Sequence, residues 1–262
     1  MPPDPPPAGA AARRGAAARR GATARGRVLR LPAVTAMLAA LVGLPPLLAG
    51  CDALGKIGAG AHTPPAKSFT VNGRVTAVVI DGGSGSVDVT GSSRSTVGVA
   101  QQASYSGTPP AATHVVRGTT LTLSYTCPAE LVCGMSYDVQ VPRGVAVTVA
   151  TGTGSVTLTS LAGPVTARAD AGLITAVDMR SAVASFKSNA GGVVASFSVA
   201  PGSLTATTNV GPITLTVPGS VAYRLSTHTV VGTSTITVRR GSDPAHSISA
   251  SSDLGTISVS PS

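Results

Sequence analysis

The sequence predicts an all-β protein: a single-domain β-solenoid (β-helix-like) with coils of about 18–23 residues, preceded by a lipoprotein signal peptide. Two observations predict the solenoid. Short segments alternate between apolar and polar residues, which is typical of strands, and similar residues recur at a nearly constant period, which is typical of stacked repeats. A third observation, an apolar N-terminal stretch that ends in a cysteine, predicts the signal peptide.

Residues 1–50 have the parts of an export signal. Seven arginines precede an apolar stretch from Leu31 to Leu48, and a basic segment followed by an apolar segment and small residues is typical of a signal peptide. Three prolines interrupt the apolar stretch. A membrane-spanning helix needs about 20 apolar residues, so we expect this segment to be cleaved.

The tetrapeptide Leu48-Ala49-Gly50-Cys51 matches the lipobox of bacterial lipoproteins. There the cysteine receives a diacylglycerol and, with acyl groups such as palmitate, becomes the N-terminus. The alternative is a chance occurrence in a segment rich in Ala and Leu. We therefore expect residues 51–68 to form a lipidated Cys51 and a flexible tether, and residues 69–262 to form the domain. The expected location is the extracytoplasmic face of the cell membrane.

The net charge of +9 is concentrated in the signal peptide. The first 50 residues hold seven Arg and one Asp (7 − 1 = +6), which leaves +3 for residues 51–262. Because nucleic-acid binding needs clustered Lys and Arg, the sequence gives no support for a nucleic-acid partner.

Cys127 and Cys133 are the only cysteines besides Cys51. Two nearby thiols in an exported chain are expected to form a disulfide. Closing so short a loop stabilises by about 2 kcal/mol in the loop-entropy model.

A column of glycines marks the repeat, with spacings of 18, 19, 20, 21 and 23 residues. Asp or Asn often stands two residues earlier, and these residues and Gly tolerate left-handed backbone and form turns. We therefore expect a structural turn ladder, with Asn189 left-handed and Asn189→Val costing about 1 kcal/mol. The glycines are Gly154, Gly172, Gly191, Gly211, Gly232 and Gly255, and the ladder includes Asp170, Asn189, Asn209 and Asp253.

Apolar residues recur on both sides of this column, so each unit is predicted to be strand, turn, strand with alternate residues facing inward. The unit around Gly232 slips by about two residues, which predicts a bulge there. Residues 90–146 also alternate and are expected to add strands. The predicted outward positions are rich in hydroxyls, namely Thr157, Thr166, Thr175, Thr205 and Thr214.

The motif Thr151-Gly152-Thr153-Gly154-Ser155-Val156, and Cys127 to Cys133 running into Tyr137-Asp138-Val139, resemble the bacterial putative-adhesin family. This family is common in actinobacterial envelope lipoproteins, and the likeness covers roughly Phe69 to Val259. It implies a β-strand-repeat fold and, by the family's name, adhesion. Relatives often carry Asp after the turn glycine, and this chain has other residues there.

No catalytic, metal or cofactor site is predicted. The four histidines are scattered without zinc-ligand spacing, and no serine-nucleophile motif is present. Asp170 and Asp178 form the most enzyme-like carboxylate pair, although turn-forming roles explain both.

Tyr105, Tyr125 and Tyr137 are the candidates for ligand contact, because Tyr is favoured in binding sites. Alternation with Leu121 and Leu123 makes a core position the alternative for Tyr125.

These observations predict a non-catalytic, lipid-anchored envelope protein that acts as a binding or adhesion module. Its expected partners are the membrane, through the N-terminal lipid, and an envelope glycan or membrane protein. The alternatives are an accessory or sensory lipoprotein of envelope-stress signalling and, less favoured, a polysaccharide-active β-helix enzyme.

Overall fold

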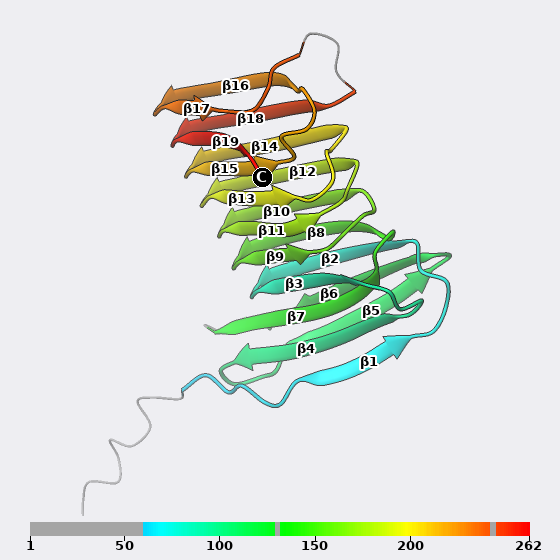
Figure 1. Ribbon diagram of the computed structural model, residues 1–262. Helices are drawn as coiled ribbons and strands as arrows, with labels where there is room; N and C mark the ends of the chain where they lie inside the picture. The colour runs from blue at the N-terminus through cyan, green and yellow to red at the C-terminus, as the bar shows by residue number, and fades with distance from the viewer. Residues whose placement is uncertain (1–59, 129–131, 242–244) are drawn as a thin grey trace, which may run out of the picture. The chain divides into compact units, whose positions relative to one another are not determined.

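The computed structural model describes residues 60–128, 132–241 and 245–262, so Cys51, the signal peptide and the start of the tether lie outside the described residues. The described residues all belong to one compact unit that spans Ala53–Ser262. They form strands and connecting turns without a helix, and the strands make two mixed sheets (Figure 1). The prediction of an all-β protein is confirmed.

Sheet A contains ten strands and sheet B nine among the described residues. In spatial order, sheet A is β1 (Lys67–Val71), β4 (Val97–Tyr105), β7 (Cys133–Pro142), β3 (Val87–Ser92), β9 (Val156–Thr159), β11 (Ile174–Met179), β13 (Val193–Phe197), β15 (Ile213–Val217), β19 (Ile257–Pro261) and β17 (Ser234–Ile236). Sheet B is β16 (Arg224–Val231), β18 (Ser247–Leu254), β14 (Ser203–Val210), β12 (Val183–Ala190), β10 (Val165–Ala171), β8 (Ala146–Thr153), β2 (Ala77–Ser84), β6 (Thr120–Thr126) and β5 (Ala111–Arg117).

From β8 onward the chain alternates between the sheets, and each sheet B strand with its following sheet A strand makes one unit. Successive units pair in parallel, with like residues aligned: Val165 lies opposite Val147 on one side and Ala184 on the other. The same alignment relates Val156 to Ile174 in sheet A. The predicted strand–turn–strand columns are therefore confirmed (Figure 1).

The N-terminal end of the stack is antiparallel. Strands β1 and β4 pair with each other and β4 pairs with β7, all antiparallel, at the end of sheet A. Strand β5 pairs antiparallel with β6 at the end of sheet B. These three strands make both sheets mixed.

At the C-terminal end the spatial order departs from the chain order. Strand β18 lies between β14 and β16, and β19 lies between β15 and β17. The bulge predicted after Gly232 is wrong, because Ser234 and Ile236 pair with Ile257 and Val259 in unbroken register. The inward position of Ser234 is polar because β17 forms the edge of the sheet, where no further unit covers it.

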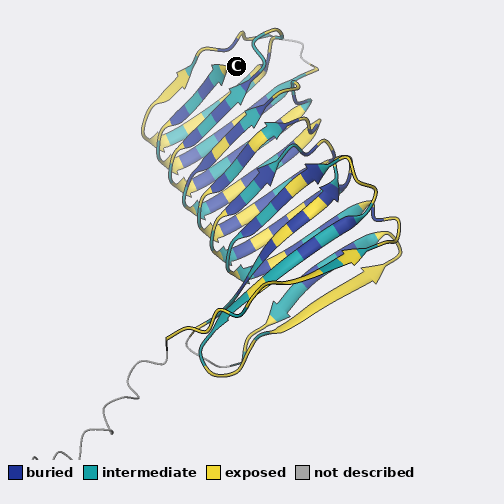
Figure 2. Cartoon of the chain, turned by 60° about the horizontal axis from the view of Figure 1, so that its bottom comes forward, coloured by how far each residue is buried: buried dark blue, intermediate teal, exposed yellow. Residues whose placement is uncertain are grey.

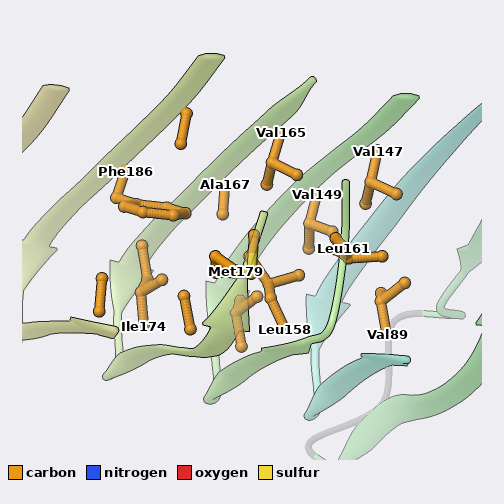
Figure 3. Close-up of a cluster of buried hydrophobic side chains, with 14 of the residues drawn as sticks. Val89, Val147, Val149, Leu158, Leu161, Val165, Ala167, Ile174, Met179 and Phe186 are labelled. Atoms are coloured by element: carbon orange, nitrogen blue, oxygen red, sulfur yellow. The ribbon is translucent and has the colours of Figure 1, made fainter. Parts of the chain in front are cut away.

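The core is a thin apolar layer between the two sheets. Val147, Val149 and Leu158 project from both sides into this layer, with Phe186 and Met179 beside them (Figure 3). Buried and exposed residues alternate along the strands (Figure 2), as the strand period requires. Small inward residues such as Ala167 and Ala206 keep the layer thin.

The disulfide between Cys127 and Cys133 is confirmed, with an S–S distance of 2.03 Å. Cys127 directly follows β6 of sheet B, and Cys133 begins β7 of sheet A. The bond therefore closes the connection where the chain crosses from one sheet to the other.

The glycine column forms the turns between the sheets, but the left-handed backbone expected at Asn189 is wrong. Positive φ angles fall on Gly154 (141°), Gly191 (144°) and Gly211 (144°), whereas Asn189 lies inside β12. Asp170, Asn209 and Asp253 likewise lie inside β10, β14 and β18. Asp170 and Asn189 are linked side by side, since Asn189 Nδ2 donates to Asp170 Oδ1 at 2.8 Å.

Candidate functional site

The three candidate tyrosines have three different environments. Tyr137 on β7 is 1% exposed, and its hydroxyl has no hydrogen-bond partner among the described residues. Burial is the main cause that raises the pKa of Tyr137 to about 12, followed by Tyr125 and Asp81. The Tyr125 hydroxyl donates to the carbonyl oxygen of Ser84 at 2.8 Å and accepts from its amide. The hydrogen bonds of Tyr125 therefore indicate a structural role. Tyr105 lines one open pocket, and Tyr137 is among the residues that line another.

A polar hollow that sequence reasoning missed lies on the outer face of sheet A. Its floor is made by Gly98 and Ala100, the small outward residues of β4, which alternate with the buried Val97 and Val99. Two adjoining hollows of about 270 and 320 Å³ share Ala100 and Asp138. We call them together the sheet A trough.

Neighbouring strands supply the walls of the trough. Asp138 on β7 lies opposite Ala100, and Gln140 lies opposite Gly98. Ser68 and Thr70 of β1 flank the same two floor residues on the other side. A side chain at the floor would fill the trough, so its depth follows from the missing bulk at two alternate positions of β4.

The trough combines acceptors and donors of hydrogen bonds. Asp88 and Asp138 lie opposite each other on β3 and β7, and neither carboxylate makes a hydrogen bond or ion pair with another described residue. Like charges on neighbouring strands repel each other, so a ligand that donates hydrogen bonds to them would be stabilising. The remaining polar lining includes Arg94, Gln102, Gln140, Ser86 and Ser136.

Two rows of outward side chains extend from the trough along sheet A. Asp88 aligns with Thr157 of β9, and the row continues through Thr175, Val194, Thr214 and Ser258. The second row runs from Gln140 through Thr90 and Thr159 to Val177. After a register shift between β11 and β13, Ser196, Thr216 and Ser260 align in the following strands. Most of these side chains carry hydroxyls, so the outer face of sheet A is a largely polar surface, interrupted by the exposed Val177 and Val194.

The five predicted outward threonines lie on two faces. Thr157, Thr175 and Thr214 lie on sheet A, as above, whereas Thr166 and Thr205 align through Ser185 on the outer face of sheet B. The two sets cannot act on one flat ligand, because the core separates the sheets.

Asp170 and Asp178 are not brought together. Asp170 lies before the turn into β11, and Asp178 lies near the end of that strand. The intervening strand holds them roughly 15 Å apart, beyond the separation of about 5–9.5 Å that glycosidases use.

The surroundings of Asp178 indicate a structural role at a corner of the stack. Ser160 Oγ donates to its carboxylate at 2.8 Å, and Arg180 lies 3.8 Å away. Hydrogen bonds from Ser198 and Ser160, together with the positive charge of Arg180, lower the pKa of Asp178. Its backbone is left-handed, with φ of 52°.

Within the described ranges, no group of three or more His, Cys, Asp or Glu side chains is placed to hold a metal ion. The same part of the chain has no helix of the length and apolar character that a membrane span requires.

No protein-family profile and no curated protein matches this chain. Several solved structures resemble it. A putative cell adhesion protein from Clostridium sporogenes is 12% identical, with a TM-score of 0.46 over 76% of this chain and 100% of that chain. A putative adhesin from Bacteroides fragilis is 14% identical, with a TM-score of 0.35 over 76% and 97%. A putative adhesin from Parabacteroides distasonis is 11% identical, with a TM-score of 0.32 over 78% and 98%. At these values the likenesses assign no activity to this chain.

Proposed function

We propose that this protein is a lipid-anchored, extracytoplasmic envelope protein whose β-solenoid domain is a non-catalytic adhesion module that binds a glycan. The observation that carries the proposal is the sheet A trough and its continuation in two rows of hydroxyl side chains. Parallel stacking of like units supports the solenoid architecture.

The chemistry of the trough favours a polyhydroxylated ligand. Sugar hydroxyls both donate and accept hydrogen bonds, and the trough offers carboxylate acceptors, amides that do both, and one guanidinium donor. Hydrogen bonds to charged groups contribute about 1.5–3 kcal/mol each. The adjacent carboxylates of Asp88 and Asp138 repel phosphates, which argues against a nucleic-acid ligand.

Anchoring at Cys51 would hold the trough near the membrane. Nine residues separate Cys51 from Ala61, which directly precedes His62, a residue that is hydrogen-bonded to β4. Such a segment spans at most about 35 Å when fully extended. The trough would then face wall polymers that lie close to the membrane surface, such as peptidoglycan or wall polysaccharide.

The proposal is tested by retention of the detergent-extracted protein on separated peptidoglycan, wall polysaccharide and solubilised membrane proteins. Ala100→Trp fills the trough floor, and Ala150→Trp adds the same bulk to an exposed position on sheet B. We expect saturable glycan retention that Ala100→Trp abolishes and Ala150→Trp preserves. Equal retention of both variants would place glycan binding elsewhere. Capture of a single membrane protein without glycan binding would support the signalling accessory instead.

A further inference from the structure

A second pocket lies at the N-terminal end of the stack, between the sheets rather than on their outer face. It measures about 360 Å³ and is lined by Tyr105, Met135, Ala103, Ala112, Lys67, Gln101 and four prolines. We call it the Tyr105 pocket. Apart from Gln101, its lining is distinct from that of the sheet A trough.

The pocket exists because small residues stand at inward positions where other strands carry bulky ones. On β4 the inward positions begin with the buried Val97 and Val99, but Ala103 follows farther along. Ala103 lies opposite the buried Met135. On the facing sheet, Ala112 of β5 is exposed. The apolar layer therefore stops at Met135 and leaves an open space between the sheets.

The rim of the pocket is built by the segment through which the chain enters the domain. His62 and Tyr105 exchange two backbone hydrogen bonds, at 2.7 and 3.0 Å. Their rings lie 5.9 Å apart. Cys133 of the disulfide pairs with Tyr105 from the other side, and Pro64, Pro65, Pro109 and Pro110 complete the rim. Because backbone hydrogen bonds and prolines hold these segments in place, the opening of the pocket, which we call its mouth, is preformed.

The lining favours an alkyl chain over a sugar. It is dominated by apolar side chains, and its polar side chains are Lys67, Gln101 and the hydroxyl of Tyr105. A sugar ring would bury several hydroxyls without partners, at a cost of about 1–3 kcal/mol each. An alkyl chain gains about 0.8 kcal/mol for each buried CH₂, and the volume lies at the lower end of the range for ligand pockets, about 300–1,000 Å³. Lys67 is placed to pair with an anionic headgroup.

We propose that the Tyr105 pocket binds one acyl chain of an anionic lipid from the membrane. The inference rests on the proposed anchoring, because that brings the mouth to the bilayer. His62 is eleven residues beyond Cys51 (62 − 51), and a chain of that length spans at most about 39 Å even when fully extended. The lipid would then be a second attachment point that holds the N-terminal end of the stack at the membrane surface.

The test places a photoreactive benzophenone amino acid at residue 112 of the full chain, in a bacterium that processes lipoproteins. Ala112 lines the pocket, and the matched control site is Ala150, an exposed alanine on sheet B. After irradiation of isolated membranes, mass spectrometry identifies the adducts. We expect a lipid adduct at residue 112 and its absence at residue 150. Ala103→Phe, which fills the pocket, should abolish the adduct while leaving the melting temperature within the range of the parent protein.

Other outcomes overturn the proposal. Equal lipid adducts at residues 112 and 150 would indicate nonspecific contact with the bilayer. A cross-link from residue 112 to the acyl group on Cys51 would show that the chain's own lipid fills the pocket. A peptide adduct would show a protein occupant, and the absence of any adduct would show an empty pocket.

The proposed function has separate readouts, which are membrane release by Cys51→Ala and glycan retention sensitive to Ala100→Trp. A lipid adduct at residue 112 without glycan retention would support lipid binding in the Tyr105 pocket and contradict the adhesion function. Glycan retention without a lipid adduct would support the adhesion function and contradict lipid binding in the pocket.

Discussion

Gly191 and Gly172 lie in contact across neighbouring units: a Cβ placed on Gly191 would stand 2.2 Å from the carbonyl oxygen of Gly172. The same relation joins Gly172 to Gly154 and Gly211 to Gly191, at 1.9 and 2.1 Å. Each turn thus rests directly on the backbone of the turn below it, and a side chain at any of these positions meets a backbone atom that cannot rotate away.

Gly191→Ala is therefore expected to destabilise the domain by about 3 kcal/mol, because the new Cβ strains a left-handed backbone and clashes with a carbonyl. The measurement is the urea midpoint of the mature protein. Gly144→Ala is the control, since nothing lies within 4 Å of its added Cβ, and it should change stability by no more than about 0.5 kcal/mol.

Asn189→Val tests whether the Asp and Asn positions of the turn ladder contribute to stability independently of its glycines. The structure places Asn189 in β12, where a β-branched residue is well accommodated, so the variant should stay within about 0.5 kcal/mol of the parent. A loss as large as that of Gly191→Ala would show that Asn189 itself shapes the turn.

The sequence predicted the repeating part of the fold because stacked units align equivalent residues, so that inward positions such as Val147, Val165 and Ala184 recur in one register. The disulfide followed from the short spacing between Cys127 and Cys133 in a chain with an export signal. In both cases the relevant information lies within one or two neighbouring units.

The alignment of equivalent residues also explains why the order of units at the C-terminal end could not be predicted. Leu204, Leu225 and Ile248 occupy equivalent inward positions, so β14 could accept either β16 or β18 as its neighbour. The sheet A trough was missed because β1, β4, β7 and β3 are not consecutive in the chain. The alternation of Gly98 and Ala100 with Val97 and Val99 was the one local signal of a hollow.

Reduction of the Cys127–Cys133 disulfide should destabilise the protein by about 2 kcal/mol, because the six-residue separation constrains a short loop of the unfolded chain. For a domain of this size that corresponds to a fall in Tm of about 4–8 °C. The measurement is thermal unfolding with and without reductant. A Cys127→Ser, Cys133→Ser variant should already melt at the lower temperature and be insensitive to reductant, and a reductant effect on that variant would place the sensitivity elsewhere.

Tyr137→Phe should stabilise the domain by about 1 kcal/mol at neutral pH, because it removes a buried hydroxyl that has no partner among the described residues. Tyr125→Phe is the matched control and should destabilise, since it removes the two hydrogen bonds to Ser84. Urea unfolding at pH 7 distinguishes the two variants, and a loss of stability in Tyr137→Phe would reveal a partner for that hydroxyl.

The same residue should make stability fall at high pH. Its pKa is raised from 10.0 to about 12 in the folded state, chiefly by burial. The stability contribution is fully present below pH 10, where the tyrosine is protonated in both states. It is lost as the pH rises from about 10 to 12, because the unfolded chain ionises first. The parent protein should lose more stability than Tyr137→Phe over this range, and parallel curves would contradict the assignment.

Cys51→Ala should release the protein from membranes, because the proposed anchor is the lipid on this thiol. The measurement is partition between the aqueous and detergent phases of a cell extract. Cys133→Ser removes the disulfide within the domain and should leave the protein in the detergent phase. Retention of Cys51→Ala in that phase would eliminate the anchor without affecting the argument for the trough.

Truncation after His246 should unfold two units rather than one. In the described sheets, β16 and β17 pair only with β18 and β19, so removing the last two strands leaves the preceding unit without a neighbour. Truncation after Val217 removes both units by design. The two truncated proteins should therefore melt within about 2 °C of each other, a difference of no more than about 1 kcal/mol at this size. Hydrogen exchange of the β16 amides decides the alternative: protection that survives truncation after His246 would mean that β16 moves over to pair with β14, which the equivalence of their inward residues would permit.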